Sequence, residues 1–535
     1  MRPAKLFHPL ALTIALAMSA CAHGRAMTAP PTAAATTSGE QSQQSQSPAT
    51  TIQSFTAVEG ADLNARLEAA SQRARSKQTP YWSAYAFDVR PGVAVDPTIH
   101  QFNGSMNTYG DTTVFMGTTA NGMTVETRNL AIFVLRAPGN NQVTRMEIYN
   151  LERKREYGGY PVYWLDRANN EESLNYLRGL ADAAPSSLLA ERAVLAISLH
   201  DDNHVGGLLK NFIRTSQNRR IRLSSVYWLG QVGGEQAFLA DLVRSETEDQ
   251  DLRKRAAYAI GESRDRSALA TLQTLYDTVT NLEVRRSIVH AAGENEDRDA
   301  ALSFVLKVAK TDADRENRRA AVHQLGEFEG DRVVDELMKI YASDADIEVK
   351  RAVLHALGEA RSSRAQVRLL EVARTDALPD LRRDAIHMLA ERGEAVVEDL
   401  IKLYDTEQNT EVRRTVLHAL AEINGSRAED KLFEIARGDA SMDLRRQAIN
   451  VLGERASARS LDFLSATAQS ADGNTEVQLQ AVRAISERSA DEAVPILIKI
   501  AKTHPNQLVR RQAIRALGES GDPRAVEFFR EVLAK

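Results

Sequence analysis

The chain has 535 residues, of which 43% are hydrophobic and 26% are charged, and its formal net charge is −5. Acidic and basic residues are mixed along the sequence, so there is no basic segment of the kind that binds nucleic acid, and we expect no nucleic-acid partner. Cys21 is the single cysteine, which excludes an intramolecular disulfide.

Residues 1–21 have the pattern of an export signal. A basic start is followed by an apolar run over residues 10–20, which is too short to span a bilayer. The run ends in Met-Ser-Ala-Cys21, which resembles a bacterial lipobox with Met18 in place of the usual leucine. The resemblance implies lipidation of Cys21 and an exported protein, either periplasmic or anchored at the outer membrane. An ordinary secretory signal cleaved after Ala22 is the alternative.

Residues 22–54 are rich in Thr, Ala, Ser, Gln and Pro. This composition lacks the apolar mass needed to offset the entropy cost of ordering, so it predicts a disordered tether. We expect the lipid on Cys21 to be the only contact with a membrane.

Residues 55–165 differ in composition from the rest of the chain. A short helix is predicted over residues 61–75, and β-branched and aromatic residues then alternate between turn signals. We therefore expect four to six strands in a small antiparallel β domain. Its aromatic residues either form the core of the sheet or line a binding groove.

The region over residues 175–535 repeats with a fixed period. A glycine-glutamate step recurs every 31 to 33 residues, with degenerate copies in between. Around each step, apolar residues fall at helical spacing, and a second helical pattern follows a short polar break. One such hairpin cannot bury its own apolar stripe, so we predict a mainly α protein with an α-solenoid of about eleven stacked helix hairpins. The clear steps begin at Gly261, Gly293, Gly326, Gly358, Gly453 and Gly518.

One unit reads EVRRSIVHAAGE from Glu283 to Glu294, and another reads EVKRAVLHALGE from Glu348. This pattern resembles the short HEAT repeats of phycobilisome lyases and bacterial scaffold proteins. The resemblance implies that the helix carrying the motif lines the concave surface of the solenoid, where protein partners dock.

Aligning the units on the glycine brings scattered residues into columns. The positions seven and three before the glycine, and one after it, share the helix face opposite the buried one. In five consecutive units these positions hold Arg, His and Glu: Arg286, His290, Glu294, Arg319, His323, Glu327, Arg351, His355, Glu359, Arg383, His387, Glu391, Arg414, His418 and Glu422. A further Arg column lies one position earlier, on the buried side, and we expect it to bind acidic residues in the turns between units.

Two interpretations of this stripe remain open: a solvated helix face and a binding face for a protein partner. A metal site is not expected, because neighbouring units are roughly 8–10 Å apart and their histidines do not share an ion. The HEAT-like di-iron hydroxylase family has His-Glu dipeptides where this chain has Arg286-Ser287 and Arg319-Ala320. We therefore do not expect the hydroxylase activity of that family. The segment from His200 to His204, His-Asp-Asp-Asn-His, is either a metal-binding group or a polar loop.

The sequence therefore favours an exported scaffold that binds one or more proteins through its solenoid surface. We expect no catalytic residue, no metal and no cofactor. The alternative is an enzyme or an enzyme accessory subunit, lyase-like or metal-dependent, that uses the same surface.

Overall fold

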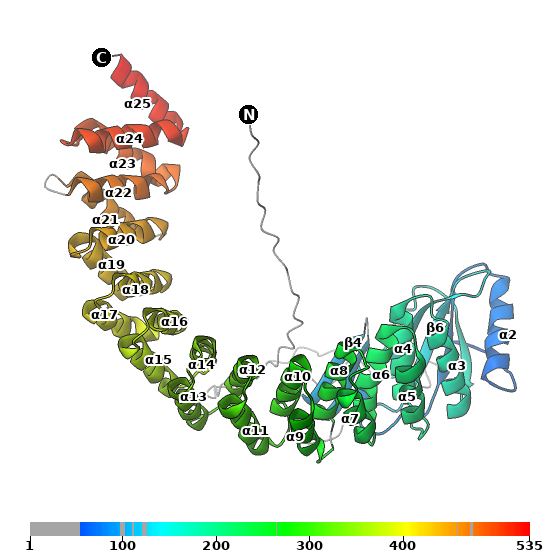
Figure 1. Ribbon diagram of the computed structural model, residues 1–535. Coiled ribbons are helices and arrows are strands. Elements are labelled where there is room, and N and C mark those ends of the chain that lie inside the picture. The colour runs from blue at the N-terminus through cyan, green and yellow to red at the C-terminus, as the bar shows by residue number, and fades with distance from the viewer. Residues whose placement is uncertain are drawn as a thin grey trace, which may run out of the picture.

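The computed structural model describes residues 54–96, 102–109, 112–119, 126–263, 265–455, 457–470 and 474–534. The predicted signal, Cys21 and nearly all of the predicted tether lie outside these residues. Figure 1 shows a β region at one end of the chain and an array of helices that curves away from it as an arc.

The β region holds two sheets. The strands are β1 (Thr56–Ala57), β2 (Tyr81–Ala86), β3 (Val93–Val95), β4 (Phe102–Tyr109), β5 (Thr112–Thr119), β6 (Leu130–Arg136), β7 (Val143–Asn150) and β8 (Val162–Arg167). The larger sheet has the order β1-β8-β2-β6-β7, and the smaller has the order β3-β5-β4.

The expected antiparallel pairing is confirmed for β2 with β6, β6 with β7, and both pairs of the smaller sheet. In contrast, β8 pairs in parallel with β2 and with β1, so the larger sheet is mixed. The reason is the connection over residues 151–161, which crosses from the β7 edge of the sheet to the far side of β2. The very short β1 and β3 also raise the strand number above the predicted four to six, because they carry too few residues to form an alternating pattern.

Both faces of the larger sheet are buried. The predicted helix forms as α2 (Leu63–Arg75), and with α3 (Asn170–Asp182) it contributes to the core on one face. On the other face, Trp82, Phe133 and Trp164 form an aromatic cluster. The ring of Tyr157, from the crossing connection, stacks on Phe133 with centroids 5.3 Å apart. The described aromatic residues of the sheet are thus buried in its core.

Eleven helix hairpins follow within the described residues. In each hairpin the first helix carries the repeated motif. These motif helices are α4 (Ser187–Ser198), α6 (Arg219–Val232), α8 (Gln250–Gly261), α10 (Leu282–Gly293), α12 (Arg315–Gly326), α14 (Ile347–Glu359), α16 (Pro379–Ala390), α18 (Thr410–Glu422), α20 (Met442–Glu454), α22 (Thr475–Ser486) and α24 (Gln507–Ser520).

The second helices are α5 (Val205–Thr215), α7 (Gln236–Arg244), α9 (Ala268–Thr278), α11 (Arg298–Thr311), α13 (Asp331–Ser343), α15 (Ser363–Thr375), α17 (Val397–Thr406), α19 (Ser426–Gly438), α21 (Ala458–Gln469), α23 (Ala490–Thr503) and α25 (Pro523–Leu533). A short 3-10 helix, η1 (Gly393–Val396), precedes α17. None of the described helices has the length and apolar composition needed to cross a bilayer.

The glycine of the motif lets adjacent motif helices approach closely. A Cβ atom on Gly261 would lie 2.5 Å from the carbonyl oxygen of Ala291 in the next motif helix, and one on Gly230 would lie 2.6 Å from that of Ala259. A Cβ atom would likewise lie within 3 Å of the next motif helix at Gly293, Gly358 and Gly453. In these units the glycine therefore meets a steric requirement between neighbouring helices.

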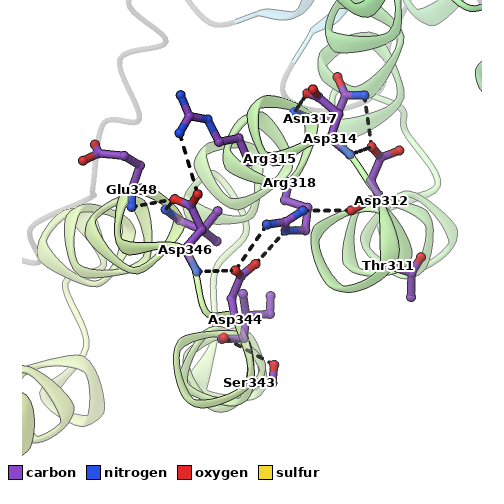
Figure 2. A network of polar contacts seen from close by, with 12 residues as sticks. Thr311, Asp312, Asp314, Arg315, Asn317, Arg318, Ser343, Asp344, Asp346 and Glu348 are labelled. Carbon is purple, nitrogen blue, oxygen red and sulfur yellow. Dashed lines mark hydrogen bonds and ion pairs between the residues drawn. The ribbon is translucent and has the colours of Figure 1, made fainter.

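The Arg column on the buried side stabilises the turns between units. Arg318 reaches both carboxylate oxygens of Asp344, at 2.6 and 3.3 Å, and donates to the carbonyl of Asp312 at 3.0 Å, as Figure 2 shows. The carboxylate of Asp344 also accepts the backbone N–H of Asp346 at 2.9 Å, which fixes the turn that begins α14. The prediction for this column is also confirmed by the ion pairs Arg285–Asp312, Arg382–Glu407 and Arg413–Asp439. Other members of the column donate to backbone carbonyl oxygens instead: Arg253, Arg445 and Arg510.

The β region and the solenoid meet at His200. Its ring stacks on Phe87 with centroids 4.4 Å apart, its Nδ1 lies 2.7 Å from the carbonyl oxygen of Ala196, and its Nε2 lies 2.8 Å from the hydroxyl of Ser173. The hydroxyl of Ser173 also lies 3.0 Å from the hydroxyl of Tyr85. Burial lowers the pKa of His200 to about 4, against smaller opposing effects of Ala196, Asp202 and Asp88. The junction is thus closed around a neutral imidazole.

Candidate interaction surface

The motif helices line the inner side of the arc, and the second helices lie on its outer side (Figure 1). The apolar face of each motif helix is buried between its neighbours, so the opposite face is presented to the concave surface. The Arg–His–Glu stripe, defined as the fifteen residues from Arg286 to Glu422 named above, lies on α10, α12, α14, α16 and α18, with Glu294, Glu327 and Glu391 as the C-cap residues of their helices.

The arginines of the stripe are already engaged in ion pairs. Each one pairs with a carboxylate three residues earlier on its own helix, as in Arg351–Glu348 at 2.7 Å and Arg383–Asp380 at 2.8 Å. Three of them also face a carboxylate of the next motif helix: Arg286–Glu316 at 3.9 Å, Arg351–Asp384 at 3.0 Å, and Arg414–Asp443. Because these pairs cancel the positive charge, the Arg column links neighbouring units and leaves little net charge for a partner.

The histidines form a row on the surface. His290, His323, His355 and His387 are exposed, and His418 is half-buried. The rings of His323 and His355 meet edge to face with centroids 5.9 Å apart. Nδ1 of His290 lies 2.6 Å from the amide oxygen of Gln324 on the next motif helix. The row thus holds one direct histidine-histidine contact, between α12 and α14.

His323 is less easily protonated than a free histidine. Although the residue is exposed overall, the atoms around its ring desolvate it, and this lowers the pKa of His323 most. The charges on His355 and Arg319 lower it further, while Glu359 opposes them. A positive charge on His323 is therefore costly at the centre of the row.

The glutamates of the stripe, which we call the acidic column (Glu294, Glu327, Glu359, Glu391 and Glu422), are exposed. Glu294 accepts a hydrogen bond from Gln324 at 3.1 Å, and Glu359 lies 3.5 Å from Nδ1 of His355. In the described part of the chain, no side-chain hydrogen bond or ion pair engages the other three carboxylates. They face solvent as a row of negative charge.

A groove of about 610 Å³ runs along the middle of the acidic column. It is lined by Gly326, Glu327, Gly358, Glu359, Arg361, Glu391 and Arg392. The guanidinium of Arg392 is directed into the protein, where it donates to the carbonyl oxygens of Leu357 and Ala360 at 3.0 and 2.6 Å. The groove thus presents three carboxylates against one exposed cation, Arg361, and its chemistry favours positively charged groups.

The sequence interpretation missed the glutamines that bridge adjacent motif helices beside the histidines. Gln324 bonds to His290 and Gln447 to His418. The bridging positions hold different residue types in different units, so the repeat pattern does not indicate them.

The sequence interpretation also missed a second pocket, of about 300 Å³, where residues 90–93 of the β region meet Glu262 and Asp265. Arg90 anchors it by donating to the carbonyl oxygens of Gln231 and Val232 at 3.1 and 3.2 Å. These contacts span about 140 residues of sequence, so no local pattern indicates them.

The segment from His200 to His204 is a connection between α4 and α5, and its two histidines diverge. His200 is buried against Ser173, whereas His204 is exposed and its Nδ1 lies 2.8 Å from Asp202. Within the described ranges, no three His, Cys, Asp or Glu side chains come together in a metal-binding arrangement.

A family model described as HEAT repeats matches residues 236–325, 302–390, 397–474 and 466–535. No curated protein matches the chain.

Three solved structures are similar to the chain in fold. Kap95p, yeast importin-β, in complex with RanGDP shares 12% identity at a TM-score of 0.36, over 66% of this chain and 56% of that chain. Human deoxyhypusine hydroxylase in complex with glycerol shares 17% identity at a TM-score of 0.21, over 54% of this chain and 96% of that chain. Lipovitellin shares 13% identity at a TM-score of 0.39, over 59% and 38%. The chain thus spans little more than half the length of Kap95p.

Proposed function

Because the chain belongs to the HEAT-repeat family, we propose that it is an exported scaffold whose concave surface binds a protein partner. Solenoids of this architecture commonly act as protein-interaction scaffolds, because stacked units create an extended concave surface. The observation that carries the proposal is the acidic column, which is exposed in five consecutive units and whose Glu327, Glu391 and Glu422 make no side-chain hydrogen bond or ion pair within the described residues.

The chemistry of the surface supports a partner segment that carries lysine or arginine. The arginines of the stripe are paired with Glu283, Glu316, Glu348, Asp380 and Glu411. Because the arginines are paired, the acidic column adds negative charge to the concave surface. An oppositely charged segment is attracted to such a row, and like-charged segments are repelled.

We further propose that the protein is located in the cell envelope. The lipobox-like Met-Ser-Ala-Cys21 supports lipidation of Cys21, and residues 22–53 are long enough to hold the folded region away from the membrane surface. The solenoid would then capture its partner within reach of this tether.

A crosslinked capture experiment tests the function. The full chain is crosslinked in intact cells, recovered from envelope fractions and compared with the variant Glu327→Gln/Glu359→Gln/Glu391→Gln. A control variant carries Glu371→Gln/Glu434→Gln/Glu527→Gln on second helices, where all three glutamates are exposed. We expect one partner to be captured by the wild type and the control and lost from the concave variant. Equal capture by both variants would contradict binding through the acidic column.

A further inference from the structure

The turns between units carry a carboxylate at one repeated position, which is interrupted at the turn after α21. The position is the C-cap residue of the second helix, and in four hairpins its carboxylate pairs with the buried-side arginine of the motif helix. The C-cap of α21 is Ser470. Five consecutive earlier hairpins hold an acid there: Asp312, Asp344, Asp376, Glu407 and Asp439.

Arg445 on α20 is the buried-side arginine of this hairpin, so the repeat supplies it with no C-cap carboxylate. Its Nε donates to the backbone carbonyl of Asp439, whose own carboxylate is engaged by Arg413 and Tyr404. Among the residues that the structure describes, no hydrogen bond or ion pair engages the two Nη atoms of Arg445. Because a guanidinium stays charged at any physiological pH, these atoms favour an anion in front of them.

A cavity of about 420 Å³ lies at this turn and is lined by Arg445 and Ser470. A second guanidinium, that of Arg437, also lines it and lies over the ring of Phe463, 5.0 Å from the centroid. No described lining residue is acidic. The cavity thus presents two positive charges at the place where the other hairpins hold a carboxylate, and its charge favours an anionic group.

Gln478 adds a second observation that does not depend on the arginines. It takes the place of the buried-side arginine on α22, lines the cavity and is 2% exposed. Its Nε2 donates to the carbonyl of Ser470, which fixes the orientation of the amide. Its Oε1 is buried and accepts no hydrogen bond within the described residues. A buried acceptor without a partner is costly, so an occupant that brings a donor is favoured.

We propose that this cavity binds a carboxylate that carries a hydrogen-bond donor close to it, as an N-acylated amino acid or a peptide C-terminus does. The carboxylate accepts from Arg445, in place of the side chain that the other hairpins supply, and the amide N–H donates to Oε1 of Gln478. The site is separate from the acidic column, because it is built from α19 to α22 and attracts the opposite charge.

The first test is titration of the purified full chain with N-acetylalanine, followed by ligand-observed NMR. Propionate lacks the N–H and should bind about 10-fold more weakly, and Arg445→Gln should weaken binding of N-acetylalanine by about 10-fold or more. Arg446→Gln is the matched control, because Arg446 is already paired with Asp443 and Glu476. A wild type that does not bind N-acetylalanine, or an Arg445→Gln variant that binds as the wild type does, would overturn the proposal.

The source of the carboxylate is distinguished by a short peptide with a free C-terminus and the same peptide amidated. Tighter binding of the free peptide than of N-acetylalanine assigns the site to a protein C-terminus, and equal or weaker binding assigns it to a small N-acylated acid. Binding of the amidated peptide as tightly as the free one would contradict carboxylate recognition.

A further test restores the carboxylate of the repeat. Ser470→Asp should raise the melting temperature, because it pairs with Arg445, and should abolish binding of N-acetylalanine. Unchanged binding in this variant would show that the carboxylate does not bind where we place it. Asp472, in the same turn, lies outside the described residues. If N-acetylalanine binds to Asp472→Asn but not to the wild type, the chain fills the cavity itself and the proposal is wrong.

Discussion

The hydroxyl of Tyr404 donates a hydrogen bond of 2.8 Å to the carboxylate of Asp439, which lies 35 residues further along the chain at the next turn between units. The same carboxylate pairs with Arg413 and accepts the backbone N–H of Ser441 at 2.8 Å. Burial, and then the bond to Asp439, raises the pKa of Tyr404 above its ordinary value. The tyrosine therefore remains a donor throughout the physiological range, and one acidic side chain joins two hairpins and a turn.

We expect Asp439→Ala to lower the free energy of unfolding by about 3 kcal/mol, because it leaves the half-buried Arg413 without its carboxylate. Tyr404→Phe should cost about 1 kcal/mol, since it removes one hydrogen bond. Denaturant unfolding followed by circular dichroism measures both. Tyr160→Phe, at an exposed tyrosine of the β region, serves as the control and should change the stability by less than about 0.5 kcal/mol.

The motif glycines allow a matched comparison of one substitution in two environments. Gly261→Ala should destabilise the protein by about 1–3 kcal/mol, because the new methyl group would lie 2.5 Å from the carbonyl oxygen of Ala291. Gly518→Ala meets open space inside α24 and should stabilise it by up to about 1 kcal/mol through helix propensity. Thermal unfolding of both variants checks the signs. A loss of stability in Gly518→Ala comparable to that in Gly261→Ala would contradict the steric explanation.

The buried His200 predicts a pH-dependent stability. Its pKa is lowered from 6.5 to about 4 in the folded protein, so between these values the unfolded chain binds a proton that the folded chain does not. The free energy of unfolding should therefore fall as the pH decreases from 6.5 to 4, by up to about 3 kcal/mol from this group. His200→Gln should flatten that part of the profile, whereas His204→Gln, at an exposed position, should leave it unchanged.

The histidine row predicts a pH-dependent affinity for the proposed partner. The pKa of His323 is lowered from its ordinary value of 6.5, chiefly by desolvation, so acidification below that value places positive charge beside the acidic column. Binding of a lysine- or arginine-bearing partner should then weaken as the pH falls below about 6.5. Replacing His290, His323, His355, His387 and His418 by glutamine should remove most of this change. An unaltered pH profile in the fivefold variant would mean that the row does not regulate binding.

Lipidation of Cys21 would determine the location of the protein. If Cys21 carries the lipid, Cys21→Ser should move the protein from the membrane fraction to the soluble part of the envelope, because the anchoring acyl chains are lost. Fractionation with quantitative immunoblotting measures this shift. A wild type that is soluble from the start would favour the secretory signal cleaved after Ala22.

The repeat could be predicted from the sequence because each unit needs apolar residues at the same helical spacing and a small residue at or near the glycine position. The glycine position and the helical spacing place residues such as His290 and His323 on one surface without any knowledge of distant contacts. The helix predicted over residues 61–75 forms over Leu63–Arg75 for a similar reason, since its pattern is local.

Other features depend on partners that no local pattern specifies. The parallel pairing of β8 with β2 follows from a connection that crosses the sheet. The engagement of Arg351 with Asp384 depends on how adjacent units are offset, which the columns alone do not determine. The pocket at Arg90 and Glu262 joins two regions far apart in the chain, so only the folded structure brings it together.

The curvature of the arc depends on the volumes of the side chains at the contacts between units. On the inner side, the motif helices touch through small residues, as at Gly230 and Ala259. On the outer side, the second helices are held apart by aromatic pairs such as Phe433 and Phe463, with ring centroids 4.6 Å apart. Small residues inside and large ones outside make each unit a wedge. Exchanging residues at these helix contacts should therefore widen or narrow the arc without changing the residues of the Arg–His–Glu stripe.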